Sequence, residues 1–130
     1  MLNTGERMDT IRQDRARKAR GKEGEELAAA YFTALGFRIL ARNHQARVGE
    51  VDLIAERGEL LCFVEVRARA SGALTSPEAT VTRAKQRKVV LAAMDYVQRH
   101  APGGRAVRFD VIAILGEKLV HLENAFDAGM

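Results

Sequence analysis

Two carboxylates stand inside otherwise apolar segments of the chain and are the residues best suited to chemistry. Asp52 directly precedes a hydrophobic pair, and Glu65 lies between two valines. A carboxylate in a core strand is costly unless a partner compensates it, so two of them in neighbouring strands need a common explanation. Each raises the pKa of the other, and a hard divalent cation such as Mg²⁺ relieves that repulsion. An ion-pair network of both carboxylates with Arg67, without a metal, also explains the pattern, as do unrelated exposed charges.

Charge is unevenly distributed around these two residues. Residues 50–65 hold five acids and one base, a net charge of −4, whereas residues 67–88 hold six bases and one acid, a net charge of +5. Four of those bases fall in the first half of a predicted helix, where the helix dipole disfavours cations and favours phosphate. The arrangement favours a polyanionic partner, and a solvated basic helix face is the alternative.

Hydrophobic periodicity predicts two helices that could position these residues. The first covers residues 22–35, and its apolar side chains recur at helical spacing; the expected core stripe is Leu27, Ala30, Tyr31, Ala34 and Leu35. The second begins at Pro77, follows a loop of small residues (70–76), and ends near His100. Its expected core stripe is Val89, Ala92, Ala93, Tyr96 and Val97.

Five strands are predicted between and after these helices, over residues 37–42, 48–55, 60–68, 107–115 and 118–122. The second and third form an antiparallel hairpin with a turn at residues 57–59. The long helix connects the third strand to the fourth, which favours a parallel pair. The chain is therefore expected to be an α/β protein of order α-β-β-β-α-β-β, with helices flanking a central mixed sheet.

The 130 residues are expected to form one domain preceded by a tail. Residues 1–20 are polar, carry a net charge of +3 and form the expected flexible basic tail, which leaves residues 21–130 as the single domain. No secretory signal or membrane-spanning stretch is expected. The lone cysteine, Cys62, lies in an apolar run and is expected to be a buried thiol, consistent with a reducing, cytoplasmic compartment.

Asp52, followed after twelve residues by Glu65-Val66-Arg67, resembles the Asp…(Asp/Glu)-x-Lys signature of restriction-endonuclease-like nucleases. The fuller strings at residues 49–55, 63–69, 81–85 and 108–111 together resemble the YraN-like bacterial family. This resemblance extends over residues 21–126. It implies a restriction-endonuclease-like core related to the archaeal Holliday-junction resolvases.

The resemblance also implies a catalytic set. Asp52 and Glu65 would bind Mg²⁺ or Mn²⁺, and Glu25 matches a glutamate on the first helix that completes the metal site in the resolvase relatives. The chain departs from the signature at Arg67, where the nucleases have lysine. Arginine stays protonated and cannot act as a base, but it can stabilise charge on a phosphate. Lys85, on the long helix, is an alternative source of an amine.

Three functional hypotheses follow. The first is a metal-dependent endonuclease on branched DNA, in which Arg67 braces the scissile phosphate while Arg69, Arg83, Lys85 and the tail hold the flanking backbone. The second is a nuclease-like module that binds DNA or RNA without turnover. The third is a protein-interaction scaffold, with the stripe on the long helix serving a homodimer. The few aromatic residues, 5% of the chain with no tryptophan, disfavour a stacking platform for single strands.

Overall fold

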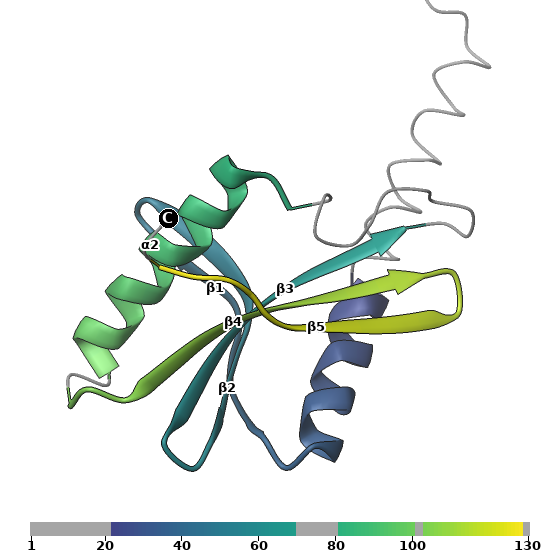
Figure 1. Cartoon of the computed structure of the whole chain (residues 1–130), viewed down its shortest axis with the longest axis horizontal. Coiled ribbons are helices and arrows are strands. Elements are labelled where there is room, and N and C mark those ends of the chain that lie inside the picture. Colours follow the sequence, from purple (N-terminus) through teal and green to yellow (C-terminus); the bar gives the residue numbers. More distant parts are fainter. Residues whose placement is uncertain (1–21, 70–80, 101–102, 129–130) are drawn as a thin grey trace, which may run out of the picture.

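A five-stranded mixed sheet forms the centre of the protein, and helices pack against it (Figure 1). The computed structural model describes residues 22–69, 81–100 and 103–128. A helix over residues 22–34 comes first, and α2 (Arg83–His100) connects the third strand to the fourth. The strands follow one another across the sheet in chain order: β1 (Arg38–Ala46), β2 (Gly49–Arg57), β3 (Leu60–Arg69), β4 (Ala106–Leu115) and β5 (Lys118–Phe126). The predicted α/β class and element order are confirmed.

Strand pairing also agrees with the expectation. β2 and β3 form an antiparallel hairpin whose turn contains Gly58 at a φ of 59°, a left-handed conformation that suits glycine. β3 and β4 are parallel, while β1 pairs with β2 and β5 with β4 in antiparallel fashion. The first and last strands are longer than predicted. Their additional residues are mostly polar and are held by backbone pairing with a neighbour, which hydrophobic alternation does not reveal.

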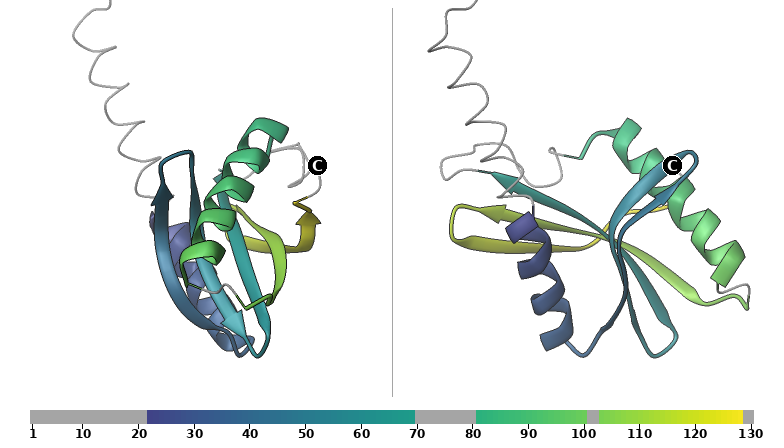
Figure 2. Two further views of the ribbon diagram at one scale, coloured as in Figure 1. Left: turned by 90° about the vertical axis from the view of Figure 1, so that its left-hand side faces the viewer. Right: turned by 180° about the vertical axis from the view of Figure 1, so that it is seen from behind.

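Side-chain alternation along the strands divides the core into two layers. Leu53 and Val64 belong to a cluster that packs with the first helix, whereas Ile54 and Phe63 belong to a second cluster that packs with α2. The two helices therefore cover opposite faces of the twisted sheet (Figure 2). Cys62 is fully buried in the first cluster, as predicted, and burial raises the pKa of its thiol.

The buried face of the first helix differs from the predicted stripe. Leu27 and Leu35 are 53% and 40% exposed, and of the predicted stripe only Tyr31 packs against the core. The buried side chains of this helix are instead those of Ala28, Ala29 and Phe32.

Close packing at the start of this helix explains the difference. Gly24 lies so near the sheet that a Cβ placed on it would be 3.3 Å from the Cδ1 of Ile114 and 3.4 Å from the Cβ of Ala68. Small residues are required at such a distance, because larger side chains would push the helix away from the strands. Helical spacing of apolar residues therefore predicted a stripe that meets the buried face only at Tyr31.

The predicted stripe of α2 is confirmed as core. Val89, Ala92 and Ala93 are buried against the sheet, with Tyr96 and Val97 packed beside them. These side chains are used within the protein's own core. The hypothesis that this stripe serves a homodimer stays a prediction.

A buried polar network ties β4 to β5 and to the first helix. Asp110 is fully buried and accepts hydrogen bonds from the Arg108 guanidinium at 2.8 and 2.9 Å and from the backbone amide of Asn124 at 3.0 Å. One nitrogen of His121 lies 2.7 Å from Asp110 and the other 2.9 Å from the Tyr31 hydroxyl. Burial alone would raise the pKa of Asp110, but the hydrogen bonds from Arg108, Asn124 and His121 lower it below its usual value.

Some expectations concern residues outside the part of the chain that the structure describes: the tail at residues 1–20, the loop at 70–76 and the helix start at Pro77. Among the described helices, none has the length and apolar character needed to cross a membrane.

Replacing Asp110 should destabilise the fold strongly. We expect Asp110→Ala to lower the free energy of unfolding by about 3–5 kcal/mol, because Arg108 and His121 would be left without their buried partner. Urea denaturation measures the change. Asp95→Ala is the matched control, since Asp95 forms an exposed ion pair with Arg99 one helical turn away and should cost only about 0.3–0.5 kcal/mol. Equal losses of stability in the two variants would contradict a structural role for the Asp110 network.

Candidate functional site

Asp52 lies where β2 separates from β3. Backbone pairing between these strands ends at Leu53 and Val64, so Asp52 and Glu65 occupy the next position along the two strands. At this position a side chain takes the place of backbone pairing between the strands. The backbone amide of Val66 on β3 donates a hydrogen bond to the Oδ2 of Asp52 at 2.8 Å. Both predicted carboxylates, Asp52 and Glu65, therefore lie at the first unpaired position of the two strands.

The direction of the side chains changes at the same point. Val51 packs in the cluster under α2, whereas Leu53 packs in the cluster under the first helix. In a regular strand these two residues would point to the same face, because side chains alternate with a period of two. The change of face at Asp52 explains how a carboxylate can stand within an apolar strand without taking a core position.

Glu65 is the more deeply buried of the two carboxylates. Its side chain is only 2% exposed, and its Oε2 has no hydrogen-bond partner among the described residues. Burial, and then the charge of Asp52, raise the pKa of Glu65 to about 8. An ionisable oxygen that is buried and unpartnered is costly, so this atom is suited to binding a cation.

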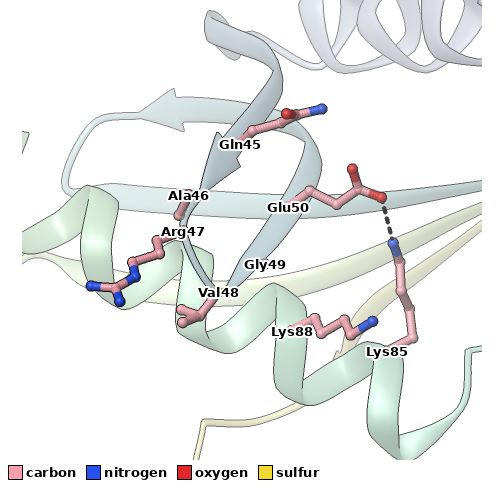
Figure 3. A pocket seen from close by; sticks show the side chains of 8 residues that line it. All are labelled: Gln45, Ala46, Arg47, Val48, Gly49, Glu50, Lys85 and Lys88. Carbon is pink, nitrogen blue, oxygen red and sulfur yellow. Dashed lines mark hydrogen bonds and ion pairs between the residues drawn. The ribbon is translucent and has the colours of Figure 1, made fainter.

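Lys85 approaches the site from α2. Its Nζ lies 3.0 Å from the Oε1 of Glu50 (Figure 3). The same Nζ lies 3.7 Å from the Oε1 of Glu65. Burial alone would lower the pKa of Lys85, but Glu65 and Glu50 raise it above its usual value. Lys85 therefore acts as an internal counter-ion and is held in its charged form, which does not suit a general base.

Arg67 stands two residues after Glu65, on the same face of β3. Its Nε is buried and has no hydrogen-bond partner among the described residues, and its charge favours the ionised form of Glu65. A buried guanidinium nitrogen without an acceptor is suited to an anionic ligand such as phosphate. The structure thus brings together Asp52, Glu65 and Arg67, together with Lys85.

Glu25 lies outside this group. Its Oε2 accepts a hydrogen bond from the Asn43 side chain at 3.0 Å, and Asn43 falls opposite Asp52 in the register of β1 and β2. Within the described ranges, no three histidine, cysteine or acidic side chains are gathered closely enough to hold a metal ion. Glu25 is therefore separated from the two site carboxylates, and its role as a third ligand stays a prediction.

Sequence reasoning did not identify Asn43. Its φ of 50° is unusual for a strand residue, and asparagine tolerates this left-handed conformation better than most residues. The predicted strand ends at Arg42, so the sequence did not place Asn43 opposite Asp52 and offered no signal for its role. Glu50 was not predicted as a site residue either, because its pairing with Lys85 depends on the position of a helix distant in sequence.

The residues predicted to hold nucleic acid are in different situations. Arg83 is the first residue of α2 and is exposed, whereas Lys85 points into the site. Arg69 is the last residue of β3, and its side chain lies outside the described part of the structure. Among these three, only Arg83 is shown to be open to a ligand at the surface.

Comparison with known proteins identifies close relatives. The "Uncharacterised protein family UPF0102" matches residues 24–114, a range that includes Asp52, Glu65 and Lys85. A UPF0102 protein of Anaeromyxobacter dehalogenans is 53% identical over 85% of this chain and 86% of its own length. Similar proteins of Myxococcus xanthus and Persephonella marina are 45% and 41% identical, over 88% and 83% of this chain and 94% and 93% of their own lengths.

The raised pKa of Glu65 makes stability depend on pH. Between pH values of about 4.5 and 8 the folded protein retains a proton on Glu65 that the unfolded chain has released. The unfolded state binds fewer protons, so this group lowers stability as pH rises, by up to about 1.4 kcal/mol per pH unit. Glu65→Gln removes this contribution. We therefore expect the variant to gain stability relative to the wild type as pH rises through this window.

Urea denaturation in metal-free buffer at several pH values measures the effect. Glu117→Gln serves as the control, because Glu117 is exposed in the turn between β4 and β5. A stability difference between wild type and Glu65→Gln that stays constant from acid to neutral pH would contradict the burial of an ionisable Glu65.

Proposed function

The chain belongs to the uncharacterised protein family UPF0102, and we propose that it is a metal-dependent endonuclease that hydrolyses phosphodiester bonds in DNA. Within this proposal it is one of the YraN-like, restriction-endonuclease-like proteins, related to the Holliday-junction resolvases. Branched DNA is the proposed substrate. The observation that carries the proposal is the pair Asp52 and Glu65, with a buried Glu65 oxygen that has no partner among the described residues.

These two residues fit a hard divalent cation. Mg²⁺ binds in proteins through one or two carboxylates and retains waters and phosphate oxygens as its other ligands. Asp52 and Glu65 supply the two carboxylates, at the point where the backbone pairing of β2 and β3 ends. Bound Mg²⁺ or Mn²⁺ would supply Lewis-acid chemistry, which lowers the pKa of a coordinated water and offsets charge on the scissile phosphate.

The chain's own cations have separate roles in this proposal. Arg67 donates from the buried, unpartnered Nε of its guanidinium to the scissile phosphate and stabilises the charge that develops there. Lys85 keeps Glu65 and Glu50 paired while the site is without a cation. Glu25 takes part as a third, weaker ligand, because Asn43 places it beside the strand that carries Asp52.

The distribution of charge supports a nucleic-acid substrate. The basic segment that follows Glu65 includes Arg69 and Arg83, and the tail before residue 21 adds further positive charge. We propose that these residues hold the DNA backbone on either side of the site. The buried free thiol of Cys62 fits a reducing cytoplasm as the place of action.

A nuclease-like module that binds nucleic acid without cleaving it is the second candidate. Arg67 supports it, since an arginine stands where the nuclease signature has a lysine and cannot activate water as a base. The raised pKa of Lys85 adds to this argument, because its amine does not take over that task. The two candidates differ in whether a metal binds and whether DNA is cleaved.

Metal binding is tested directly by calorimetry. We expect Mn²⁺ to give a binding heat with the wild type. Its affinity should be at least tenfold lower for Glu65→Gln and Asp52→Asn. The loss of Mn²⁺ affinity should be smaller for Glu25→Gln. Both main variants retain side-chain volume and remove a ligand charge. Glu123→Gln, which changes an exposed carboxylate that pairs with Arg108, is the control. Equal Mn²⁺ binding by wild type and Glu65→Gln would contradict the metal site.

Cleavage separates the two candidates. We expect the wild type with Mn²⁺ to cleave a synthetic four-way junction, Asp52→Asn to be inactive, and Arg67→Ala to be slower by on the order of 10²-fold or more, because an oriented donor on the developing charge has about this effect. Gel analysis of labelled DNA gives the rates. If wild type and Asp52→Asn produce the same residual cleavage, the endonuclease is contradicted and the binding module is favoured.

A further inference from the structure

A pocket of about 440 Å³ lies between the end of the β1–β2 hairpin and α2. The hairpin contributes Gln45, Arg47 and Glu50, and the helix contributes Lys85 and Lys88 (Figure 3). Glu50 and Lys85 also belong to the candidate functional site, so the pocket is continuous with the surroundings of Glu65. The roles proposed above use Lys85 and Glu50 but assign nothing to Lys88, Gln45 or Arg47.

One side of the pocket is formed by close packing of the β1–β2 hairpin on α2. Gly49 lies directly against the backbone of α2, because a Cβ placed on it would be 2.0 Å from the carbonyl oxygen of Lys88. No side chain fits at such a distance, so only glycine allows the hairpin to rest on the helix here. The position of Lys88 relative to the hairpin is therefore set by direct packing of two backbones.

The charges in the pocket are predominantly positive. Three cationic side chains line it against one carboxylate, and that carboxylate, Glu50, already pairs with Lys85 at 3.0 Å. Arg47 and Lys88 are exposed and pair with no carboxylate among the described residues. In Figure 3 the amine of Lys88 extends toward Lys85, while Arg47 extends away from it. Lys88 is thus an uncompensated cation of this pocket whose amine extends toward Lys85, a residue of the functional site.

We propose that this pocket is a second phosphate subsite, which takes a DNA backbone phosphate adjacent to the one at Asp52 and Glu65. Lys88 supplies the charge, and Lys85, one helical turn earlier on the same helix face, connects the two subsites. A lysine ammonium binds phosphate as a point charge without requiring a particular base. This inference rests on the proposed function, since it assigns part of the DNA path across the protein.

The experiment measures binding of a fluorescein-labelled synthetic DNA duplex by anisotropy over a series of salt concentrations, in EDTA so that no cleavage occurs. For duplex DNA, a lysine that no longer neutralises its phosphate reduces the slope of log affinity against log salt by about 0.9. We expect Lys88→Ala to show this reduction and to bind about tenfold more weakly at 0.1 M salt. Lys88→Arg retains the charge and should bind like the wild type.

Lys118→Ala is the matched control, because Lys118 is an exposed lysine at the start of β5, at the opposite end of the sheet from the pocket (Figure 1). It should have the wild-type affinity and slope. The subsite is overturned if Lys88→Ala and Lys118→Ala bind alike, or if the wild type shows no anisotropy change at low salt. Thermal unfolding of all variants checks that they are folded.

Failure of the subsite can be distinguished from failure of the proposed function. If Lys88→Ala binds DNA like the wild type while Mn²⁺ binding still depends on Glu65, the subsite is wrong and the metal site stands. If Lys88→Ala shows the reduced slope while Asp52→Asn cleaves like the wild type, the subsite is supported and the endonuclease is wrong.

Discussion

The burial of Glu65 is the constraint on which the rest of the site depends. A carboxylate at the centre of a sheet, 2% exposed, is stripped of its hydration and must be protonated or paired. Asp52 stabilises the protonated form of Glu65 through a side-chain hydrogen bond but repels the ionised form, whose ion-pair partner among the described residues is Lys85, at 3.7 Å. The surrounding structure therefore holds an interaction that is incomplete, and a divalent cation between the two carboxylates would complete it.

The fold provides this arrangement through a local separation of two strands. The backbone pairing of β2 with β3 ends at Leu53 and Val64. Asp52 and Glu65 follow at the next position of the two strands. The parallel pairing of β3 with β4 continues along the whole of β3, which keeps Glu65 within the sheet after β2 has left it. Asp110 strengthens β4 and β5 on the far side of that pair, through its contacts with Arg108, His121 and Asn124. The site therefore lies between β3, which stays paired with β4, and the part of β2 that is no longer paired with β3.

The sequence predicted much of this arrangement, and its failures have physical causes. Asp52 and Glu65 were identifiable because charge in an apolar strand is costly, and the long crossover predicted the parallel pair of β3 and β4. The buried face of the first helix was not predicted, because Gly24 permits a close approach that apolar periodicity does not encode. The contact of Lys85 with Glu65 joins residues on different elements, and its geometry is set by the packing of Gly49 on α2.

The central claim, that Asp52 and Glu65 together bind a divalent cation, is tested most directly by crystallography of the Mn²⁺-soaked protein with anomalous scattering. The account predicts an anomalous peak at coordination distance from the Oε2 of Glu65 and from a carboxylate oxygen of Asp52, with the amine of Lys85 moved away from Glu65. A protein that retains the Lys85–Glu65 contact, with no peak between the two carboxylates at saturating Mn²⁺, would contradict it.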